Sequence, residues 1–407
     1  MSYLELNLDL TDEQLMLRDN IRKFALEVMR PTAMKLDQMT PEEVIAPDSI
    51  FWDCMKQAYK LGLHKILIPE EYGGLGLSPI EVHMVVEEMG YGSSDIAIAL
   101  GVSCFPAFLA SMVPTDELIN NIIVPYCEDT EAKIMGCWAI TEPDHGSDSL
   151  APGTAQFKDP NIYGQCRARL EGDEWVINGQ KAAWVSMGTA ATHAMVYLTI
   201  DPSMGFAGGG ICLVPLDLPG VSRGKPLNKL GQRALNQGEI YFDNVRVPYE
   251  YMLVDQESYE AILDITLATA NAYVAAVFTG VARSAYEEAL NYARQRVQGG
   301  KPLVEHQHVR YKLFHMFKTV EACRALSRAA MVYNLSTSPP ATEYSIASKV
   351  FCTDAAFQVA HEAIQIFGGN GLAKEYAIEK IFRDARAGMI EDGSNDSLAL
   401  FASERLI

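Results

Sequence analysis

The spacing of apolar residues changes character twice along this chain of 407 residues. Before about residue 133 and after about residue 251, apolar residues recur at helical spacing. Between these stretches the apolar runs are short and are separated by Gly, Pro, Asp and Asn, a pattern typical of strands. The clearest runs are Glu174–Ile177, Ala194–Ile200, Gly210–Pro215 and Gly238–Phe242. The pattern therefore predicts helices, then strands, then helices, rather than one repeating architecture.

These changes predict an α+β multidomain fold. We expect a helical N-terminal domain over residues 1–133, a central antiparallel β domain over 134–250 and a C-terminal helical domain over 251–407. Pro248 is expected to mark the end of the β domain. Long C-terminal helices are expected from about Tyr259 to Val297 and after Pro302, Pro340 and Leu372.

The charge balance argues against some partners. The chain has 52 acidic and 33 basic side chains and a formal net charge of −19. Such a protein repels the phosphates of nucleic acids and of anionic lipid head groups. The most apolar long segment, Ala268–Ala282, is expected to be a buried helix because it is too short to span a bilayer.

Cysteines, histidines and the N-terminus add three further expectations. The eight cysteines form no Cys-x-x-Cys pair, which favours small core residues in a reducing compartment. The eight histidines show no metal-ligand spacing, so no metal site is expected. Acidic residues appear as early as Glu5 and Asp9, which argues against a signal or transit peptide and favours a cytoplasmic protein.

Distinctive segments occur along nearly the whole chain. They are LTDEQ (Leu10–Gln14), PEEYGGLG (Pro69–Gly76), TEPDHGSD (Thr141–Asp148), INGQKAAWVS (Ile177–Ser186), YFDNVRVP (Tyr241–Pro248), KPLVEHQ (Lys301–Gln307), QIFGGNGL (Gln365–Leu372) and RDARAGMIEDG (Arg383–Gly393). In sequence, order and spacing they resemble the acyl-CoA dehydrogenase family. The resemblance implies a helical domain, a β domain and a C-terminal four-helix bundle. It also implies FAD as cofactor, an acyl-CoA substrate, electron-transfer flavoprotein as electron acceptor and a homotetramer.

The resemblance also implies which residues contact FAD. A Trp can cover a flavin face, and a hydroxyl two residues further along a strand lies on the same side. An Arg suits a pyrophosphate, and Gly lets a backbone approach phosphates closely. The family roles fall on Trp138, Ile140 and Thr141 near the flavin edge, Ser147 and Ser394 near the ligand, Trp184 and Ser186 at the ring and N5, Arg296 and Gln307 toward a neighbouring subunit's FAD, and Gln365, Gly368 and Gly369 at the pyrophosphate.

The catalytic base is the main departure from the family pattern. Most members have a Glu where this chain has Asp392, and Asp is shorter by one C–C bond, about 1.5 Å. We favour Asp392 as the base, with Glu391 as an alternative whose side chain is expected to point away. Asp95 is a third candidate, for proton removal from a more distant carbon. Its other interpretation is the N-cap of a helix in Ser93-Ser94-Asp95.

Two positions bear on the substrate. Relatives that take dicarboxylic acyl groups have an Arg near the position of Ala97, and none is present here. Asp95 would also repel a second carboxylate. A neutral acyl group is therefore expected, with a cyclic or otherwise unusual group conceivable. Many members also have an Arg where this chain has Asn271, near the base.

Two other functions remain open. One is a flavin oxidase of the same fold, since nitroalkane oxidases resemble this family and use an Asp as base. The other is a flavin-binding relative that has lost catalysis, which the altered base and the missing Arg permit.

Overall fold

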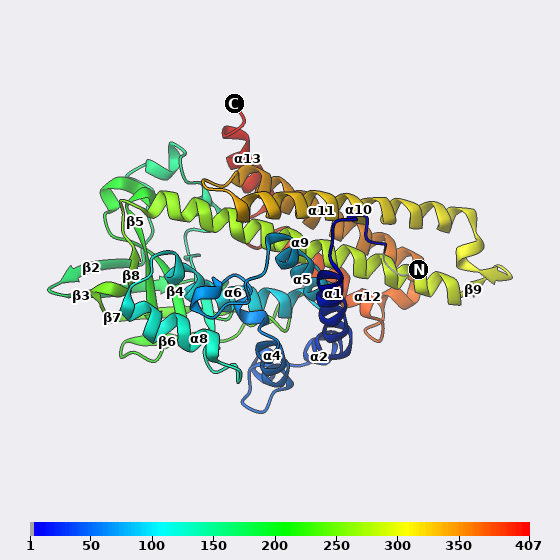
Figure 1. Ribbon diagram of the computed structural model, residues 1–407, viewed down its shortest axis with the longest axis horizontal. Coiled ribbons are helices and arrows are strands. Elements are labelled where there is room, and N and C mark those ends of the chain that lie inside the picture. Colours follow the sequence, from blue (N-terminus) through cyan, green and yellow to red (C-terminus); the bar gives the residue numbers. More distant parts are fainter. Residues whose placement is uncertain (1–3) are drawn as a thin grey trace.

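The computed structural model describes residues 4–407, and its N-terminal part is helical (Figure 1). The capping box expected at Thr11 and Gln14 begins the first helix. Short π-helical turns at Ala25–Met29 and Ile119–Ile123 continue two of the helices. The helices are α1 (Asp12–Phe24), α2 (Arg30–Leu36), α3 (Pro41–Val44), α4 (Ile50–Lys60), α5 (Pro79–Gly92), α6 (Ser94–Met112), α7 (Asp116–Leu118) and α8 (Val124–Glu128).

A twisted sheet follows at one end of the molecule (Figure 1). Its strands are β1 (Gly136–Ala139), β2 (Arg167–Glu171), β3 (Glu174–Lys181), β4 (His193–Thr199), β5 (Gly209–Pro215), β6 (Val221–Arg223), β7 (Ile240–Pro248) and β8 (Met252–Val254). The spatial order is β6-β7-β3-β2-β4-β5-β8, and β1 pairs with β4. All four short runs that the sequence indicated lie largely within strands.

One expectation about the sheet is wrong in detail. The sheet is not wholly antiparallel, because β4 pairs in parallel with β1 and with β2. Long connections join these strands, as parallel neighbours require, and residue spacing carries no information about strand direction. A short strand, β8, follows Pro248 and pairs with β5. The domain boundaries after residues 133 and 250 stay a prediction.

The C-terminal part contains the long helices α9 (Tyr259–Gln295), α10 (Gln307–Ser336) and α11 (Thr342–Phe367). Figure 1 shows them side by side, extending away from the sheet. The two-residue strands β9 (Val297–Gln298) and β10 (Lys301–Pro302) form the turn between α9 and α10. The last expected helix is two helices, α12 (Ala377–Gly388) and α13 (Asn395–Glu404), and α9 to α12 form the expected bundle.

Helix α5 packs closely on α9 and joins the N-terminal helices to the bundle. A Cβ added at Gly90 would lie 2.1 Å from the carbonyl oxygen of Val277, and one added at Gly280 would lie 2.1 Å from that of Glu87. Only Gly permits backbones to approach this closely. Glu87 and its neighbour Glu88 are buried at this contact.

Two helices, α6 and α9, are long and apolar enough to cross a membrane by length and composition. Their most apolar windows are 83% and 78% buried inside the protein, as in the core helices of soluble proteins. The expectation that Ala268–Ala282 is a buried helix is confirmed, although this segment belongs to a helix of 37 residues. All eight cysteines are also buried, as expected.

Candidate active site

The loop that carries Asp392, residues 389–394, lies between α12 and α13 and is called the base loop here. Asp392 has a φ of 52°, in the left-handed region that residues other than Gly seldom adopt. The buried Nζ of Lys349 in α11 donates to the backbone oxygen of Gly393 at 2.7 Å and to Oδ1 of Asn395 at 2.9 Å. These hydrogen bonds hold the base loop against α11 in its strained conformation.

The base loop places two neighbouring carboxyl groups in a poorly solvated environment. Desolvation raises the pKa of Asp392 to about 6, although the positive charge of Lys349 opposes this shift. Desolvation and then the charge of Asp392 raise the pKa of Glu391 to about 7. Burial lowers the pKa of Lys349 to about 8. A carboxyl group with a pKa near 6 is suited to accept a proton close to neutral pH.

The loop of residues 228–237, between β6 and β7, contacts the base loop. The side-chain amide of Gln232 donates to Oε1 of Glu391 at 2.9 Å. Nε of Arg233 donates to the backbone oxygen of Asp37 at 2.9 Å, which ties the same loop to the end of α2. The 228–237 loop therefore joins the sheet, the N-terminal helices and the base loop, and it directs the Glu391 carboxyl toward Gln232.

Asp95 lies in the first turn of α6, after the N-cap residue Ser93. Its Oδ2 accepts hydrogen bonds from Nζ of Lys380 at 2.9 Å and from the backbone N–H of Ala234 at 3.1 Å. Its Oδ1 accepts from the N–H of Ile96 at 2.9 Å and from the Ser93 hydroxyl. Burial opposes ionisation, but Lys380 and these hydrogen bonds hold the pKa of Asp95 below its usual value. A fully bonded carboxylate of low pKa is a weak base, so this environment favours a structural role.

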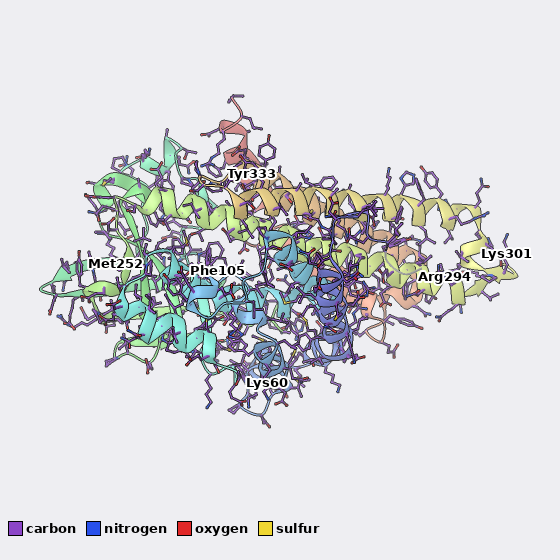
Figure 2. The ribbon with its side chains drawn as sticks, in the orientation of Figure 1. Lys60, Phe105, Met252, Arg294, Lys301 and Tyr333 are labelled. Carbon is purple, nitrogen blue, oxygen red and sulfur yellow. The ribbon has the colours of Figure 1, made fainter. Side chains whose placement is uncertain are left out.

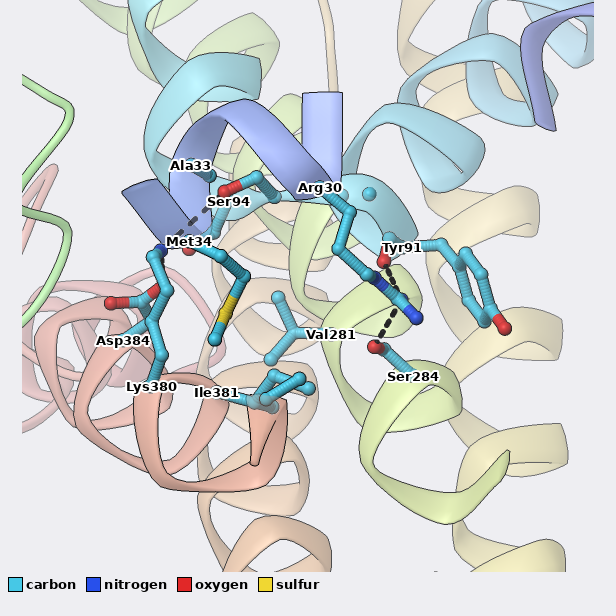
Figure 3. A pocket seen from close by; sticks show the side chains of 14 residues that line it. Arg30, Ala33, Met34, Tyr91, Ser94, Val281, Ser284, Lys380, Ile381 and Asp384 are labelled. Carbon is cyan, nitrogen blue, oxygen red and sulfur yellow. Dashed lines mark hydrogen bonds and ion pairs between the residues drawn. The ribbon is translucent and has the colours of Figure 1, made fainter. Parts of the chain in front are cut away.

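Lys380 also pairs with Asp384, one turn further along α12, at 2.5 Å. Figure 3 shows these two residues beside a small pocket between α2, α5, α9 and α12. The pocket has a volume of about 20 Å³, enough for one water molecule but not for an acyl chain. The paired charges around Asp95 are therefore part of the packed interior.

The TEPDHGSD segment folds into a turn next to the base loop. The Ser147 hydroxyl accepts a hydrogen bond from the backbone N–H of Ser394 at 2.9 Å, so two predicted ligand-binding residues meet. The carbonyl of Ile140 accepts from Lys181 at 3.0 Å, and the carbonyl of Thr141 accepts from the N–H of Ala182 at 2.8 Å. These two carbonyl groups already have partners within the protein.

Trp184 and Ser186 lie beyond the end of β3 rather than within it. The strand ends at Lys181, so the expectation that strand alternation places both side chains on one side is wrong. A turn follows because the chain leaves the sheet after Lys181, whose buried ammonium bonds to Glu142 at 2.6 Å. Ser186 instead pairs with Trp138 in an isolated β-bridge, which brings two predicted residues together. Trp184 is 58% exposed and is not a core residue.

The remaining predicted residues lie at the other end of the molecule. Figure 2 labels Arg294 and Lys301 there, opposite Met252 in the sheet, and Arg296 lies between them in the sequence. Asn370, next to the glycine-rich turn, donates to the hydroxyl of Tyr292 at 3.1 Å, which places that turn against the end of α9. The residues of this end are all exposed: Arg296, Gln307, Gln365, Gly368 and Gly369.

The predicted residues near the sheet and those at the other end of the molecule both offer groups that are suited to bind FAD. Near the sheet, Trp184 offers an exposed aromatic surface, and within residues 4–407 the buried Nε1 of Trp138 has no hydrogen-bond acceptor. At the other end, a Cβ added at Gly368 or Gly369 would meet no atom within 4 Å, so a ligand can approach the backbone there. Helix α11 rises about 24 Å from Lys349, which holds the base loop, to Gln365 at the other end of the molecule. The two groups of residues are therefore far apart within one chain.

Sequence reasoning did not identify Lys349, Lys380 or Gln232. None of them belongs to a segment that marks the resemblance. For Lys349 a signal was present, because it occupies the buried face of α11 together with Ser345, Cys352 and Ala356. A lysine on a buried helix face requires compensating partners. Gln232 and Lys380 were hidden because Glu391 and Asp95, the partners that link them to the candidate bases, are distant in sequence.

Family models and known proteins match nearly the whole chain. The N-terminal, middle and C-terminal domain models of the acyl-CoA dehydrogenases match residues 11–118, 137–245 and 263–407. A probable acyl-CoA dehydrogenase of Bacillus subtilis, YngJ, is 32% identical, with 99% of this chain and 100% of the relative covered. A cyclohex-1-ene-1-carbonyl-CoA dehydrogenase of Geobacter metallireducens is 30% identical, with 98% and 99% covered.

The solved structures show the same relationship. Butyryl-CoA dehydrogenase from Megasphaera elsdenii superimposes with a TM-score of 0.85 at 27% identity, with 98% of this chain and 100% of that chain covered. The likeness therefore extends over the helices, the sheet and the bundle together. From its sequence, its domain matches and its fold, this chain belongs to the acyl-CoA dehydrogenase family of FAD-dependent oxidoreductases.

Proposed function

We propose that this acyl-CoA dehydrogenase oxidises a neutral acyl-CoA thioester with Asp392 as the base that removes the α-proton. The observation that supports this most is the state of Asp392: its pKa is raised to about 6, and it lies on a loop held by Lys349. When bound, FAD supplies the acceptor for the hydride that leaves the β-carbon. Asp392 then holds the proton on its carboxylate.

The backbone of the base loop supports a second role. Within residues 4–407, the N–H of Asp392 has no hydrogen-bond acceptor. It is therefore free to donate to the thioester oxygen, which would make the α-proton more acidic. Ser147 and Ser394, which are hydrogen-bonded to each other, would border the ligand on the same side of the base loop.

The proposed acyl group is neutral. Asp95 keeps its negative charge through Lys380, and the segment around Ala97 contains no Arg to pair with a second carboxylate. A dicarboxylic acyl group would therefore lack the cation it needs. The name of the Geobacter relative supports testing cyclic acyl groups alongside straight ones.

We further propose that the enzyme is a homotetramer in the cytoplasm and passes its electrons to electron-transfer flavoprotein. Assembly is supported by the distance between the sheet, which Met252 marks in Figure 2, and the turn from Arg294 to Lys301, which includes Arg296; two chains together would bring both ends to one FAD. Exposed aromatic residues on α10 also favour contact with another chain: Tyr311, Phe314 and Phe317 are 64%, 61% and 43% exposed.

The alternative is an oxidase that passes electrons to oxygen. The observation that favours it is an Asp at the position of the base, as in the nitroalkane oxidases that resemble this family. The two functions differ in one measurable property. A reduced dehydrogenase is reoxidised slowly by air, whereas a reduced oxidase is reoxidised rapidly.

The deciding experiment is an anaerobic titration of the purified holoenzyme with straight-chain, branched, cyclic and dicarboxylic acyl-CoA thioesters, followed by flavin absorbance. We expect a neutral thioester to bleach the flavin and glutaryl-CoA to leave it oxidised. Bleaching by glutaryl-CoA alone would refute the neutral substrate. Bleaching by none of them would refute the dehydrogenase function. Rapid return of colour on admission of air would favour the oxidase.

A further inference from the structure

A chain of hydrogen bonds outside the base loop runs from Lys229 to Ser186. Nζ of Lys229 donates to Oε1 of Gln237 at 2.8 Å and to the backbone oxygen of Leu235 at 2.7 Å. Nε2 of Gln237 donates to Oγ of Ser186 at 3.0 Å and to the backbone oxygen of Trp184 at 3.3 Å. Gln237 is 8% exposed, so these are interior contacts.

The chemistry of the partners fixes which group donates and which accepts in each of these hydrogen bonds. An ammonium group only donates hydrogen bonds, so the atom of Gln237 that contacts Lys229 must be its carbonyl oxygen. The other end of the amide, its NH₂ group, must then contact Ser186. Because NH₂ is only a donor, Ser186 Oγ has to accept. The single hydrogen of the Ser186 hydroxyl must therefore point elsewhere.

The position of Ser186 limits where that hydrogen can point. Ser186 is bridged on one side to Gln237 and on the other to Trp138, and the turn before it carries the exposed Trp184. Gln237 occupies one side of the hydroxyl, while Ser186 is only partly buried and follows the exposed surface of Trp184 by two residues. The hydroxyl hydrogen is left for a partner that binds at that surface.

Lys229 is itself held by the architecture around the base. Desolvation lowers the pKa of Lys229 to about 8, and the charges of Glu391 in the base loop, Asp95 in α6 and Asp384 in α12 limit this shift. The 228–237 loop is fixed at its centre by Gln232, whose amide is bound to Glu391. The orientation of the Gln237 amide is thus linked to the acidic groups of the base loop and of α6 and α12.

We infer that Gln237 and Lys229 are positioning residues that make the Ser186 hydroxyl a hydrogen-bond donor toward the flavin. The inference rests on the proposed flavin contact of Ser186 and adds the device that sets the direction of that contact. A hydroxyl that is held as a donor stabilises electron density on the ring atom it faces. The two residues would therefore raise the tendency of the flavin to be reduced, without touching the flavin or the substrate.

The test is the two-electron reduction potential and the visible spectrum of the holoenzyme, in a double-mutant cycle of Gln237→Leu and Ser186→Ala. We expect Gln237→Leu to disfavour reduction by up to about tenfold, which is about 30 mV for a two-electron couple. In the Ser186→Ala background the same change should have no further effect, because the hydroxyl on which Gln237 acts is gone. Lys229→Met should shift the potential in the same direction as Gln237→Leu, by a smaller amount.

Two further variants keep the result interpretable. Gln237→Glu preserves the size of the side chain and its contact with Lys229 but removes the NH₂ donor, so the Ser186 hydroxyl would turn inward and reduction would be disfavoured. Gln165→Leu, at an exposed side chain that donates only to the carbonyl of Tyr163, should leave potential and spectrum unchanged.

Each failure has a separate meaning. If Ser186→Ala leaves potential and spectrum unchanged, the proposed flavin contact of Ser186 is wrong, and the inference falls with it. If Ser186→Ala alters them but Gln237→Leu and Gln237→Glu do not, the contact stands and the positioning role is refuted. An equal effect of Gln237→Leu with and without the Ser186 hydroxyl would also refute it.

Discussion

The chain has two pairs of adjacent acidic residues in poorly solvated surroundings, and the partners of the two pairs differ. Glu87 and Glu88 of α5 face guanidinium groups: Arg283 lies 2.7 Å from Glu87 and also pairs with Glu88, and Arg324 lies 3.0 Å from Glu87. Burial opposes ionisation and raises the pKa of Glu88, but Arg324 and Arg283 hold the pKa of Glu87 far below its usual range. Desolvation instead raises the pKa of Glu391 and of Asp392 in the base loop.

The difference lies in the partners rather than in the acids. An arginine is always charged and binds a carboxylate with a rigid, directional group, so Glu87 stays ionised and the first pair joins α5 to α9 and α10. In the base loop, Glu391 accepts a hydrogen bond from the uncharged amide of Gln232. The nearby cation, Lys349, donates to the backbone of the loop rather than to a carboxylate. The first pair stabilises the fold, whereas the second pair can change its protonation state near neutral pH.

The largest expected effect is a loss of catalysis when the proposed base in the second pair, Asp392, is replaced. Asp392→Asn keeps the shape of the side chain but cannot accept the α-proton. We expect the rate of flavin reduction by substrate to fall about 10³-fold, or about 4 kcal/mol in barrier, with FAD content unchanged. Stopped-flow measurement of flavin bleaching gives the rate.

Asp396→Asn, an exposed acid in the first turn of α13, is the matched control and should keep the rate of the unaltered enzyme. If Asp392→Asn retained more than a tenth of that rate, another group would have to be the base. Asp95→Asn would then be examined under the same conditions.

The next largest effect is a loss of folding stability when Arg283, a cation of the first pair, is replaced. Arg283→Met leaves Glu88 buried without its main cation. Removing one partner of a buried ion pair costs about 3–5 kcal/mol. We expect a large fall in the thermal unfolding temperature, measured by circular dichroism. Arg246→Met, which breaks exposed pairs with Glu171 and Glu174, should leave that temperature unchanged. Equal effects of the two substitutions would mean that burial does not distinguish these ion pairs.

The two acidic pairs also show how far the sequence could lead. Asp392 was identified because it interrupts a recognisable segment next to a glycine. The helix–strand–helix order followed from apolar spacing, which depends on neighbours along the chain. Contacts between distant segments could not be predicted, because they leave no local pattern in the sequence. Arg283 lies 196 residues from Glu87, and Gln232 lies 159 residues from Glu391. The turn at Trp184 was also missed, because its cause is the burial of Lys181 against Glu142.

A smaller effect should follow from disturbing the helix contact that the first pair reinforces. Gly280→Ala places a methyl group where the carbonyl of Glu87 would be 2.1 Å away, so α5 and α9 must separate. Overpacking of this kind costs about 1–3 kcal/mol. Thermal unfolding should therefore begin at a lower temperature than in the unaltered protein. Arg294→Ala, at an exposed position on the same helix, provides the comparison and should change stability little. No change with Gly280→Ala would show that α5 is not held to α9 at this distance.

The smallest effect is a shift in pH dependence within the second pair. A protonated base cannot remove the α-proton, so kcat/KM should rise with pH through the pKa values of about 6 and about 7 and then level off. Glu391→Gln removes the negative charge that competes with the ionisation of Asp392, so the acid limb should move to lower pH, by up to about one unit. The pH profile of flavin reduction measures it, with the exposed Glu375→Gln as the control. A rate loss like that of Asp392→Asn would instead make Glu391 the base. An unshifted limb would mean that the two carboxyl groups titrate independently, and that desolvation and Lys349 set the pKa of Asp392.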